Sequence, residues 1–244
     1  MKLRSALITG SSVRVGRTIA LHLAREGWFV HIHARTRNAQ AEETLREVLD
    51  GGGQGAIATG DIATRQGCEE VFAQIDPNLG LDLLVNNIGV YRTGPLARLP
   101  AQDWDAMMRT NLDGTFHCSQ LAIPRLREGG SIVNLGYVGV ASLAGSLKTA
   151  AYSATKAGIL VLTKSLALEL APRRIRVNMV SPGQLENSVD LPEDYARRIP
   201  LGRPGTSEEI AGLISWLASE AGSYVTGQNI DVAGGLMLGL RGEG

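Results

Sequence analysis

Cysteine is scarce in this sequence, and the scarcity narrows the kinds of protein it can be. Only Cys68 and Cys118 occur in 244 residues, and neither belongs to a Cys-x-x-Cys pair. The four histidines form no ligand pattern with them or with each other. A disulfide-stabilised secreted domain or a zinc module would need more cysteines at closer spacing. We therefore expect two small buried cysteines, no disulfide and no metal site.

Excess charge and long apolar runs are also missing. The 24 Lys and Arg residues balance 24 Asp and Glu, and no basic block of the kind that binds nucleic acid is present. The apolar run near the N-terminus, residues 6–8, is too short for a signal segment or a membrane span. We expect a cytoplasmic protein that acts on a small molecule, without a nucleic-acid or membrane partner.

What the sequence does contain is a regular alternation of strand and helix patterns, and 44% of its residues are hydrophobic. The pattern repeats without a break in composition, which predicts one domain over residues 1–244. We expect an α/β fold with a doubly wound parallel sheet of the Rossmann type, helices on both faces, and a ligand across the carboxyl ends of the strands. The expected strands cover residues 3–9, 29–33, 55–59, 81–85, 131–135, 176–180 and 228–232, and the expected helices 17–26, 39–49, 65–75, 101–126, 151–170 and 207–218, the last capped by Ser207.

A glycine-bearing turn joins the first strand to the first helix. Gly10 permits a tight turn, and Gly16 lets the helix pack closely on the strand. The helix N-terminus then offers N–H groups and a positive dipole end to a pyrophosphate. An ordinary strand-to-helix turn is the alternative interpretation. The candidate cofactor contacts in this turn are Gly10, Ser12, Arg14, Val15 and Gly16.

The end of the second strand favours NADP over NAD. Proteins that bind NAD usually carry an acidic residue there, which hydrogen-bonds the ribose 2′-hydroxyl. This chain instead has Arg35 and, two residues later, Arg37. Arginine suits a 2′-phosphate, so we predict NADP(H), with Arg35 as the main contact. The alternative is that both arginines are simply solvated.

Tyr152 and Lys156 lie four residues apart in a helical stretch, which places both side chains on one face. A free tyrosine has a pKa near 10, and a nearby cation lowers it. The pair is therefore a candidate proton donor, with the pKa of Tyr152 lowered by Lys156. Alone, the same spacing also fits a solvated helix face.

Taken together, these motifs resemble the short-chain dehydrogenase/reductase family over nearly the whole chain. The resemblance is carried by the Gly10–Gly16 turn, Asp61, Asn86-Asn87-x-Gly89, Asn111, Tyr152-x-x-x-Lys156 and Pro182-Gly183. It implies further cofactor contacts at Asp61, Ile62, Asn87, Gly89, Pro182 and Gly183. It also implies that Tyr152 gives the proton, that Lys156 holds the nicotinamide ribose, and that Asn111 anchors a relay water.

Two groups within the family look most similar, the pteridine reductases and the β-ketoacyl carrier-protein reductases. Arg14 replaces the usual middle glycine, as in pteridine reductases, and Tyr91 aligns with their pterin-stacking aromatic. Gly89 looks more like the ketoacyl group, and Ile88 stands where alanine is common. The usual catalytic serine is missing: Tyr137 fills its place on a loop two residues longer, with Ser142 and Ser146 as other candidate donors.

The predicted function is NADPH-dependent transfer of hydride to a C=O or C=N carbon, in a dihydropterin or in a β-ketoacyl or other ketone. The alternative is a non-catalytic NADPH-binding sensor or scaffold, suggested by the missing serine. The helix after Lys156 is apolar nearly all round, which indicates a second subunit against it, and the family implies a homotetramer. Residues 184–200 have no strong period and are a candidate lid over the site.

Overall fold

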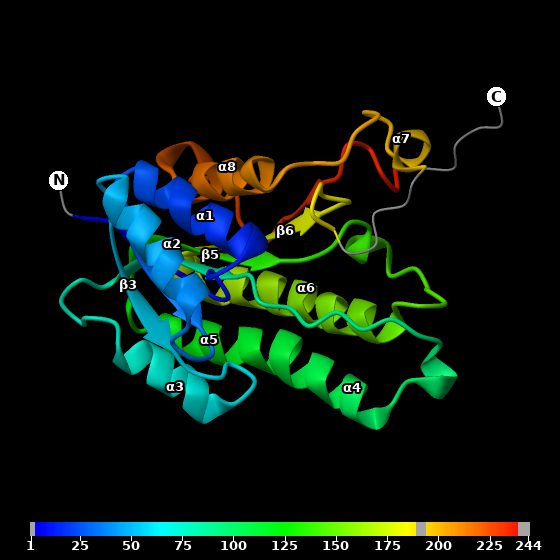
Figure 1. The fold of residues 1–244 in the computed structure, drawn as a ribbon, viewed down its shortest axis with the longest axis horizontal. Helices are drawn as coiled ribbons and strands as arrows, with labels where there is room; N and C mark the ends of the chain where they lie inside the picture. Colours follow the sequence, from blue (N-terminus) through cyan, green and yellow to red (C-terminus); the bar gives the residue numbers. More distant parts are fainter. Residues whose placement is uncertain (1–2, 189–193, 239–244) are drawn as a thin grey trace.

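Seven parallel strands form one sheet at the centre of the molecule (Figure 1). We describe it from a computed structural model, which covers residues 3–188 and 194–238. The strand order is β3-β2-β1-β4-β5-β6-β7. The strands are β1 (Ser5–Ile8), β2 (Phe29–Ala34), β3 (Gln54–Thr59), β4 (Leu81–Asn86), β5 (Leu126–Leu135), β6 (Arg176–Pro182) and β7 (Asn229–Val232).

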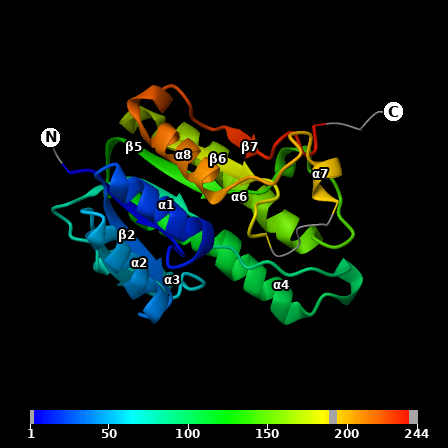
Figure 2. The ribbon, with the colours of Figure 1, turned by 45° about the horizontal axis from the view of Figure 1, so that its top comes forward.

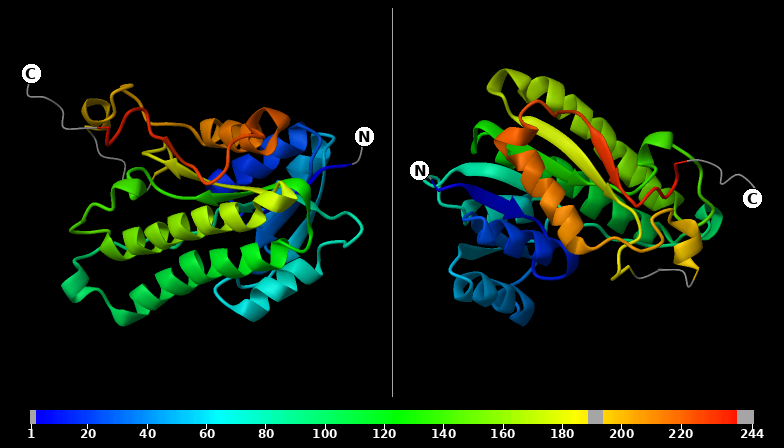
Figure 3. Two further views of the ribbon diagram at one scale, coloured as in Figure 1. Left: turned by 180° about the vertical axis from the view of Figure 1, so that it is seen from behind. Right: turned by 90° about the horizontal axis from the view of Figure 1, so that it is seen from above.

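Helices cover both faces of the sheet (Figure 3). On one face lie α1 (Arg14–Arg25), α2 (Ala39–Asp50) and α8 (Ser207–Ala218). On the other lie α3 (Arg65–Ala73), α4 (Ala101–Met107), α5 (Gly114–Ala122) and α6 (Ala150–Leu170). Successive strand residues alternate between the two cores, so that Ile8 packs on the first face and Leu7 on the second. A strand buried on both faces is apolar throughout, and the predicted doubly wound fold is confirmed.

One predicted helix differs from the structure. The long helix expected over residues 101–126 contains a π-helical turn, Met108–Asp113, between α4 and α5, and it ends at Ala122. The side chain of Asn111 in this turn is hydrogen-bonded to the backbone of Val90. A π turn of this kind frequently marks a functional site, because it re-aims one side chain without ending the helix.

The start of α8 is a second correction. The expected cap, Ser207, is the first helical residue, and Thr206 is the cap. The Thr206 hydroxyl accepts a hydrogen bond from the Glu209 N–H at 3.2 Å, and the Glu209 carboxylate accepts one from the Thr206 N–H at 2.8 Å. This reciprocal pair is a capping box, whose Thr-x-x-Glu spacing identifies Thr206 rather than its neighbour.

The central position of β1 determines where a ligand can bind. From β1 the chain continues to β2 on one side, and the later strands follow on the other side, beginning with β4. A crevice opens at the carboxyl ends of the strands where the order reverses. Figure 2 shows the N-terminus of α1 at this end of the sheet, together with the short helix α7 (Tyr195–Arg198). Among the described residues, no helix is long and apolar enough to cross a membrane.

Candidate active site

The turn after β1 needs glycine at two positions. Gly10 has a φ of +64°, and a Cβ there would lie 2.4 Å from Cγ1 of Ile88. A Cβ on Gly16 would lie 2.4 Å from the Gly10 carbonyl oxygen and 2.5 Å from the amide nitrogen of Asn87. Both contacts are shorter than side chains tolerate, so the turn, the start of α1 and the end of β4 pack together only with glycine here.

A cavity of about 400 Å³ opens beside this turn. It lies at the N-terminus of α1, where unpaired N–H groups favour an anion. Arg14, the first residue of α1, has a φ of +52°, a left-handed conformation in which glycine is easily accommodated. Its side chain is exposed at the cavity. The lining residues are Gly10, Ser12, Val13, Arg14, Val15, Gly16, Ala34, Arg35, Asn38, Asn87, Ile88 and Gly89.

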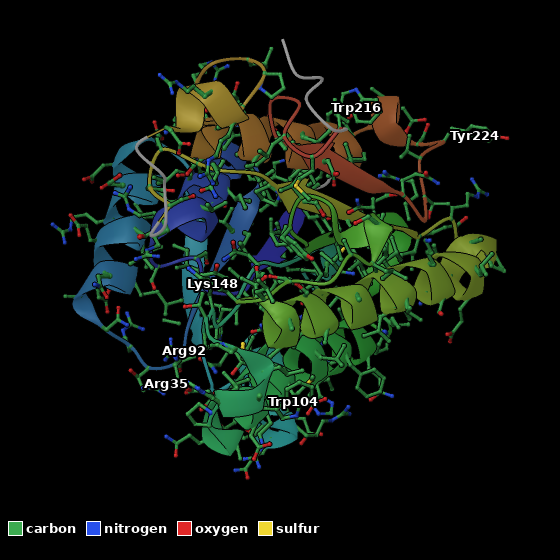
Figure 4. All side chains as sticks on the ribbon, turned by 90° about the vertical axis from the view of Figure 1, so that its right-hand side faces the viewer. Arg35, Arg92, Trp104, Lys148, Trp216 and Tyr224 are labelled. Carbon is green, nitrogen blue, oxygen red and sulfur yellow. The ribbon has the colours of Figure 1, made fainter. Side chains whose placement is uncertain are left out.

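The two arginines after β2 differ in their partners. Arg37 is ion-paired with Glu42 near the start of α2. Arg35 lines the cavity, is exposed, and has no ion pair within residues 3–188 and 194–238 (Figure 4). A cation that is not already neutralised is available to a phosphate. The cavity, its glycine turn and Arg35 therefore fit a dinucleotide that carries a 2′-phosphate.

Asn87 fixes the turn to β4. Its backbone N–H donates to the Thr9 hydroxyl at 2.9 Å, and its side-chain amide donates to the carbonyl oxygens of Thr9 (2.8 Å) and Gly10 (3.2 Å). Asp61 and Ile62, two further predicted cofactor contacts, lie just after β3 and line neither cavity. The Asp61 carboxylate is exposed and accepts a hydrogen bond from the Ala63 N–H.

A second cavity of about 350 Å³ adjoins the first, and Val15, Asn87 and Gly89 line both. It reaches from the glycine turn to α6, so one extended ligand can occupy both spaces. Most of the predicted catalytic and substrate residues meet here. Its other lining residues are Tyr91, Leu135, Gly136, Tyr137, Val138, Thr149, Tyr152, Lys156, Pro182, Gly183, Gln184 and Ser188. The predicted lid over 184–200 therefore contributes Gln184 and Ser188, while residues 189–193 lie outside the described part of the chain.

Lys156 is buried at the bottom of the second cavity. Its ammonium group donates to the Leu135 carbonyl oxygen at 2.6 Å and lies 5.5 Å from the centre of the Tyr152 ring. Burial disfavours the charged form and lowers the pKa of Lys156 to about 8. The group therefore remains mostly protonated at neutral pH.

Asn111 lies behind Gly89, next to Lys156. A Cβ placed on Gly89 would be 3.5 Å from the Lys156 nitrogen and 3.8 Å from the Asn111 side-chain oxygen. The Asn111 amide accepts from the Val90 N–H (2.7 Å) and donates to the Val90 carbonyl oxygen (3.0 Å) and to Thr155 (3.2 Å). Its side chain thus holds the Gly89–Val90 segment against α6, and its predicted part in a water relay stays a prediction.

The pKa of Tyr152 differs from the one that the sequence predicts. The sequence predicts that Lys156 lowers its pKa. In the structure the pKa of Tyr152 is raised well above its ordinary value, first by burial and then by the neighbouring Tyr91 and Tyr137. The phenol therefore carries its proton throughout the neutral range, which suits a group that donates one.

Two aromatic rings also contact Tyr152. The ring centre of Tyr91 is 5.0 Å away in an edge-on arrangement, and that of Tyr137 is 5.8 Å away. The Tyr137 hydroxyl donates to Ser153 at 3.0 Å, next to the expected proton donor. The alternative donors Ser142 and Ser146 do not line the cavity; Ser142 donates to the Gly139 carbonyl, and Ser146 accepts from Thr149.

Four important partners were not foreseen from the sequence. Ser153 and Thr155 lie inside the Tyr152-x-x-x-Lys156 motif, and that position was the one available signal for them. The backbone carbonyl of Leu135 cannot be predicted from the sequence, because a residue of any type has one. The fourth, His33, contacts the glycine turn through its ring. The two cysteines are buried and free as expected, but their sulfur atoms lie 3.7 Å apart, which their sequence separation gave no reason to expect.

A parallel sheet, a glycine turn with a phosphate-binding cavity, and a Tyr-Lys pair at the far end of the same crevice define a nucleotide-dependent oxidoreductase. A family model described as enoyl-(acyl carrier protein) reductase matches residues 11–237. The 3-oxoacyl-(acyl-carrier-protein) reductase FabG of Staphylococcus aureus is 38% identical, over 96% of this chain and 98% of the relative.

Solved structures agree with this match. The landomycin C-6 ketoreductase LanV, with bound NADP and rabelomycin, superposes with a TM-score of 0.89 at 28% identity, covering 97% of each chain. A dehydrogenase/reductase from Sinorhizobium meliloti 1021 has a TM-score of 0.90 at 33% identity, covering 96% of this chain and 95% of its own. The chain belongs to the short-chain dehydrogenase/reductase family. It is an NADP-dependent oxidoreductase, as the motifs and the cationic end of β2 predicted.

Proposed function

We propose that the protein reduces a ketone with NADPH, and that the substrate lies in the second cavity with its carbonyl oxygen at Tyr152. The observation that supports this most directly is that Tyr152 lines the second cavity with buried Lys156 5.5 Å from its ring and with Tyr137, which is hydrogen-bonded to Ser153, 5.8 Å from it. The names of the relatives agree, since both FabG and LanV are reductases of keto groups.

Each residue has a proposed part in the reaction. Bound NADPH supplies hydride to the carbonyl carbon. Tyr152 donates its proton to the oxygen, which becomes more basic than the phenol as hydride arrives. Lys156 stabilises the phenolate that remains and holds the nicotinamide ribose. We propose that Tyr137 replaces the missing serine: with substrate bound, its single hydroxyl hydrogen turns to the carbonyl oxygen, and the Ser153 hydroxyl then donates to Tyr137.

Dihydropterin reduction is the second candidate, because two observations favour it. Tyr91 lines the cavity and is partly exposed, so a flat ring system bound there would contact its ring. Arg14 stands at the cofactor turn, as in pteridine reductases. We rank dihydropterin reduction below ketone reduction because the curated relatives are named as 3-oxoacyl-(acyl-carrier-protein) reductases.

NADPH consumption over a substrate panel tests the order of these candidates. The panel contains an acetoacetyl thioester, a bicyclic aromatic ketone, a dihydropterin and a quinone, each followed by the loss of NADPH absorbance. We expect turnover of at least one ketone and slower or no turnover of the dihydropterin. Turnover of the dihydropterin alone would contradict the proposal. Cofactor binding without turnover of any panel member would support the sensor or scaffold alternative.

We also propose a homo-oligomer, a tetramer by family resemblance, built from this one domain and located in the cytoplasm. The predicted apolar helix α6 packs Ile159 and Leu160 against the sheet but leaves Val161 63% and Leu168 81% exposed. Helices α4 and α5 lie beside α6 (Figure 3). Phe116 on α5 and Trp104 on α4, the latter labelled in Figure 4, are also exposed. An apolar face of this kind is typical of an interface. Light scattering measures the mass of the protein in solution, and the mass of a single chain would refute the proposed oligomer.

A further inference from the structure

His33, near the end of β2, is fully buried beneath the glycine turn. Its Nδ1 atom accepts a hydrogen bond from the Gly10 N–H at 2.9 Å, and its Nε2 atom lies 3.0 Å from the Gly60 carbonyl oxygen. Its backbone N–H donates to the Ser11 hydroxyl (2.9 Å), and its carbonyl accepts from the Ser11 N–H (3.0 Å). One residue therefore ties the phosphate-binding turn both to β2 and to the end of β3.

These two ring contacts require a single protonation state. The Gly10 N–H can only donate, so Nδ1 must present a lone pair to it. The Gly60 carbonyl can only accept, so Nε2 must carry the hydrogen. The ring is thus the neutral Nε2–H tautomer. A second proton, on Nδ1, would face the Gly10 N–H, break that bond and leave a buried charge.

The surroundings of the ring give little support to the charged form. The segment 5–8 of β1 carries no titratable residue. On α1, Arg14 is exposed, Arg17 is paired with Glu47, and His22 and Arg25 are paired with Glu208. Arg65 of α3 is paired with Glu69. The Asp61 carboxylate and the Gly60 carbonyl favour the charged ring, but burial outweighs both and lowers the pKa of His33 below its ordinary value.

We propose that His33 is a positioning residue for the cofactor: its neutral ring holds the Gly10 N–H in place, and protonation of the ring releases the phosphate-binding turn and weakens NADP(H) binding. The effect passes through Gly10, whose position is fixed on its other side by Asn87 and Ile88. Any shift of this turn moves the start of α1, and with it the wall of the first cavity. The inference rests on the assigned NADP(H) cofactor and needs no particular substrate.

The test is NADP⁺ affinity against pH, measured by calorimetry without substrate. In the wild type, Kd rises by up to about tenfold for each pH unit below the pKa of His33. The 2′-phosphate of NADP⁺ also titrates at mildly acidic pH, so the reference is His33→Asn. The Asn oxygen can take the place of Nδ1 as acceptor for Gly10 but does not titrate. We expect His33→Asn to bind NADP⁺ within about threefold of wild type at pH 7.5 and to lack the additional loss at low pH.

A second variant and a spectroscopic measurement complete the test. His33→Leu removes the acceptor, and we expect its Kd to be raised about tenfold or more at every pH. If that variant does not fold, the wild-type and His33→Asn comparison still decides the question. Nitrogen-15 NMR of the wild type without cofactor reports the His33 tautomer directly. An Nδ1–H tautomer at pH 7.5, or the same pH dependence of Kd in His33→Asn and wild type, would overturn the proposal.

Discussion

Tyr152 separates two regions that are built in different ways. The proton-donor side, formed by Lys156, Asn111 and Thr155, is buried and hydrogen-bonded to backbone groups of Leu135 and Val90. The substrate side, formed by Tyr137 and Tyr91, lies on segments without regular structure after β5 and β4. The Tyr137 hydroxyl donates to another side chain, that of Ser153.

The difference indicates which part of the site can change between related enzymes. A side chain bonded to backbone carbonyl and N–H groups keeps its partners whatever residues surround it. A side chain on a loop that bonds to another side chain can be exchanged together with that partner. We therefore expect the proton-donor side to carry the common chemistry and the substrate side to carry the choice of substrate. Three variants test this division, beginning with the residue between the two sides.

Tyr152→Phe should have the largest effect. It removes the hydroxyl that we propose as the proton donor while keeping the ring that packs on Tyr91 and Tyr137. We expect kcat to fall about 10²–10⁴-fold with the best ketone from the panel, the usual range for loss of a general acid. Calorimetry with NADP⁺ is the control, and its Kd should remain within about threefold of wild type. A variant that keeps full activity would show that Tyr152 is not the donor.

Lys156→Met should reduce activity and yet stabilise the protein. Activity should fall about 10²-fold because the cation beside Tyr152 is lost. The buried ammonium itself destabilises the fold, since burial lowers the pKa of Lys156 from 10.5 to about 8. We expect the free energy of unfolding at pH 7 to increase by up to roughly 3 kcal/mol, the equivalent of this shift, as measured by urea denaturation.

The same variant gives a pH signature with a definite sign. Between about pH 8 and 10.5 the folded wild type has lost the Lys156 proton while the unfolded chain retains it. The unfolded state then binds more protons, so wild-type stability gains a contribution that rises with pH in this window. Lys156→Met lacks this contribution. A stability difference between the two proteins that does not shrink from pH 8 to 10.5 would contradict a buried, shifted Lys156.

Tyr137→Phe should have the smallest of the three effects. Loss of one hydrogen-bond donor to a reacting oxygen typically costs about 10²–10³-fold, but Ser153 remains nearby as a partial replacement. We expect a fall of about 10- to 10²-fold in kcat/KM, with NADP⁺ affinity unchanged. Ser146→Ala is the matched control on the same loop, and we expect a change of less than about twofold because Ser146 does not line the cavity. A larger loss of activity in Ser146→Ala than in Tyr137→Phe would instead identify Ser146 as the hydrogen-bond donor to the carbonyl oxygen.

Local patterns were enough to predict the fold, whereas contacts between distant segments were not. The alternation of apolar strands and amphipathic helices reports burial directly, so the parallel sheet followed from it. The π turn at Met108–Asp113 could not be predicted, because it accompanies a hydrogen bond between Asn111 and Val90, which lies on another segment. The sequence likewise places Tyr152 and Lys156 on one helix face but does not reveal how deeply they are buried.

Burial explains why the acidity of Tyr152 was predicted with the wrong sign. The four-residue spacing suggested that Lys156 would dominate, but burial raises the pKa of Tyr152, and Tyr91 and Tyr137, which come from two other segments, raise it further. His33 shows the same limit. It has the sequence context of an ordinary strand residue, and its function depends on Gly10 and Gly60, which the fold brings to its two ring nitrogens.

The strand order also has a consequence for the chain as it is synthesised. Every residue that lines the first cavity lies within the first 89 positions, and strands β1 to β4 pair with one another without help from later strands. Ribosomes release the N-terminal part of a chain first. Tyr137, Tyr152 and Lys156 emerge afterwards, as β5, β6 and β7 extend the open edge of β4. A growing chain therefore carries every residue that lines the first cavity before it carries Tyr152 and Lys156.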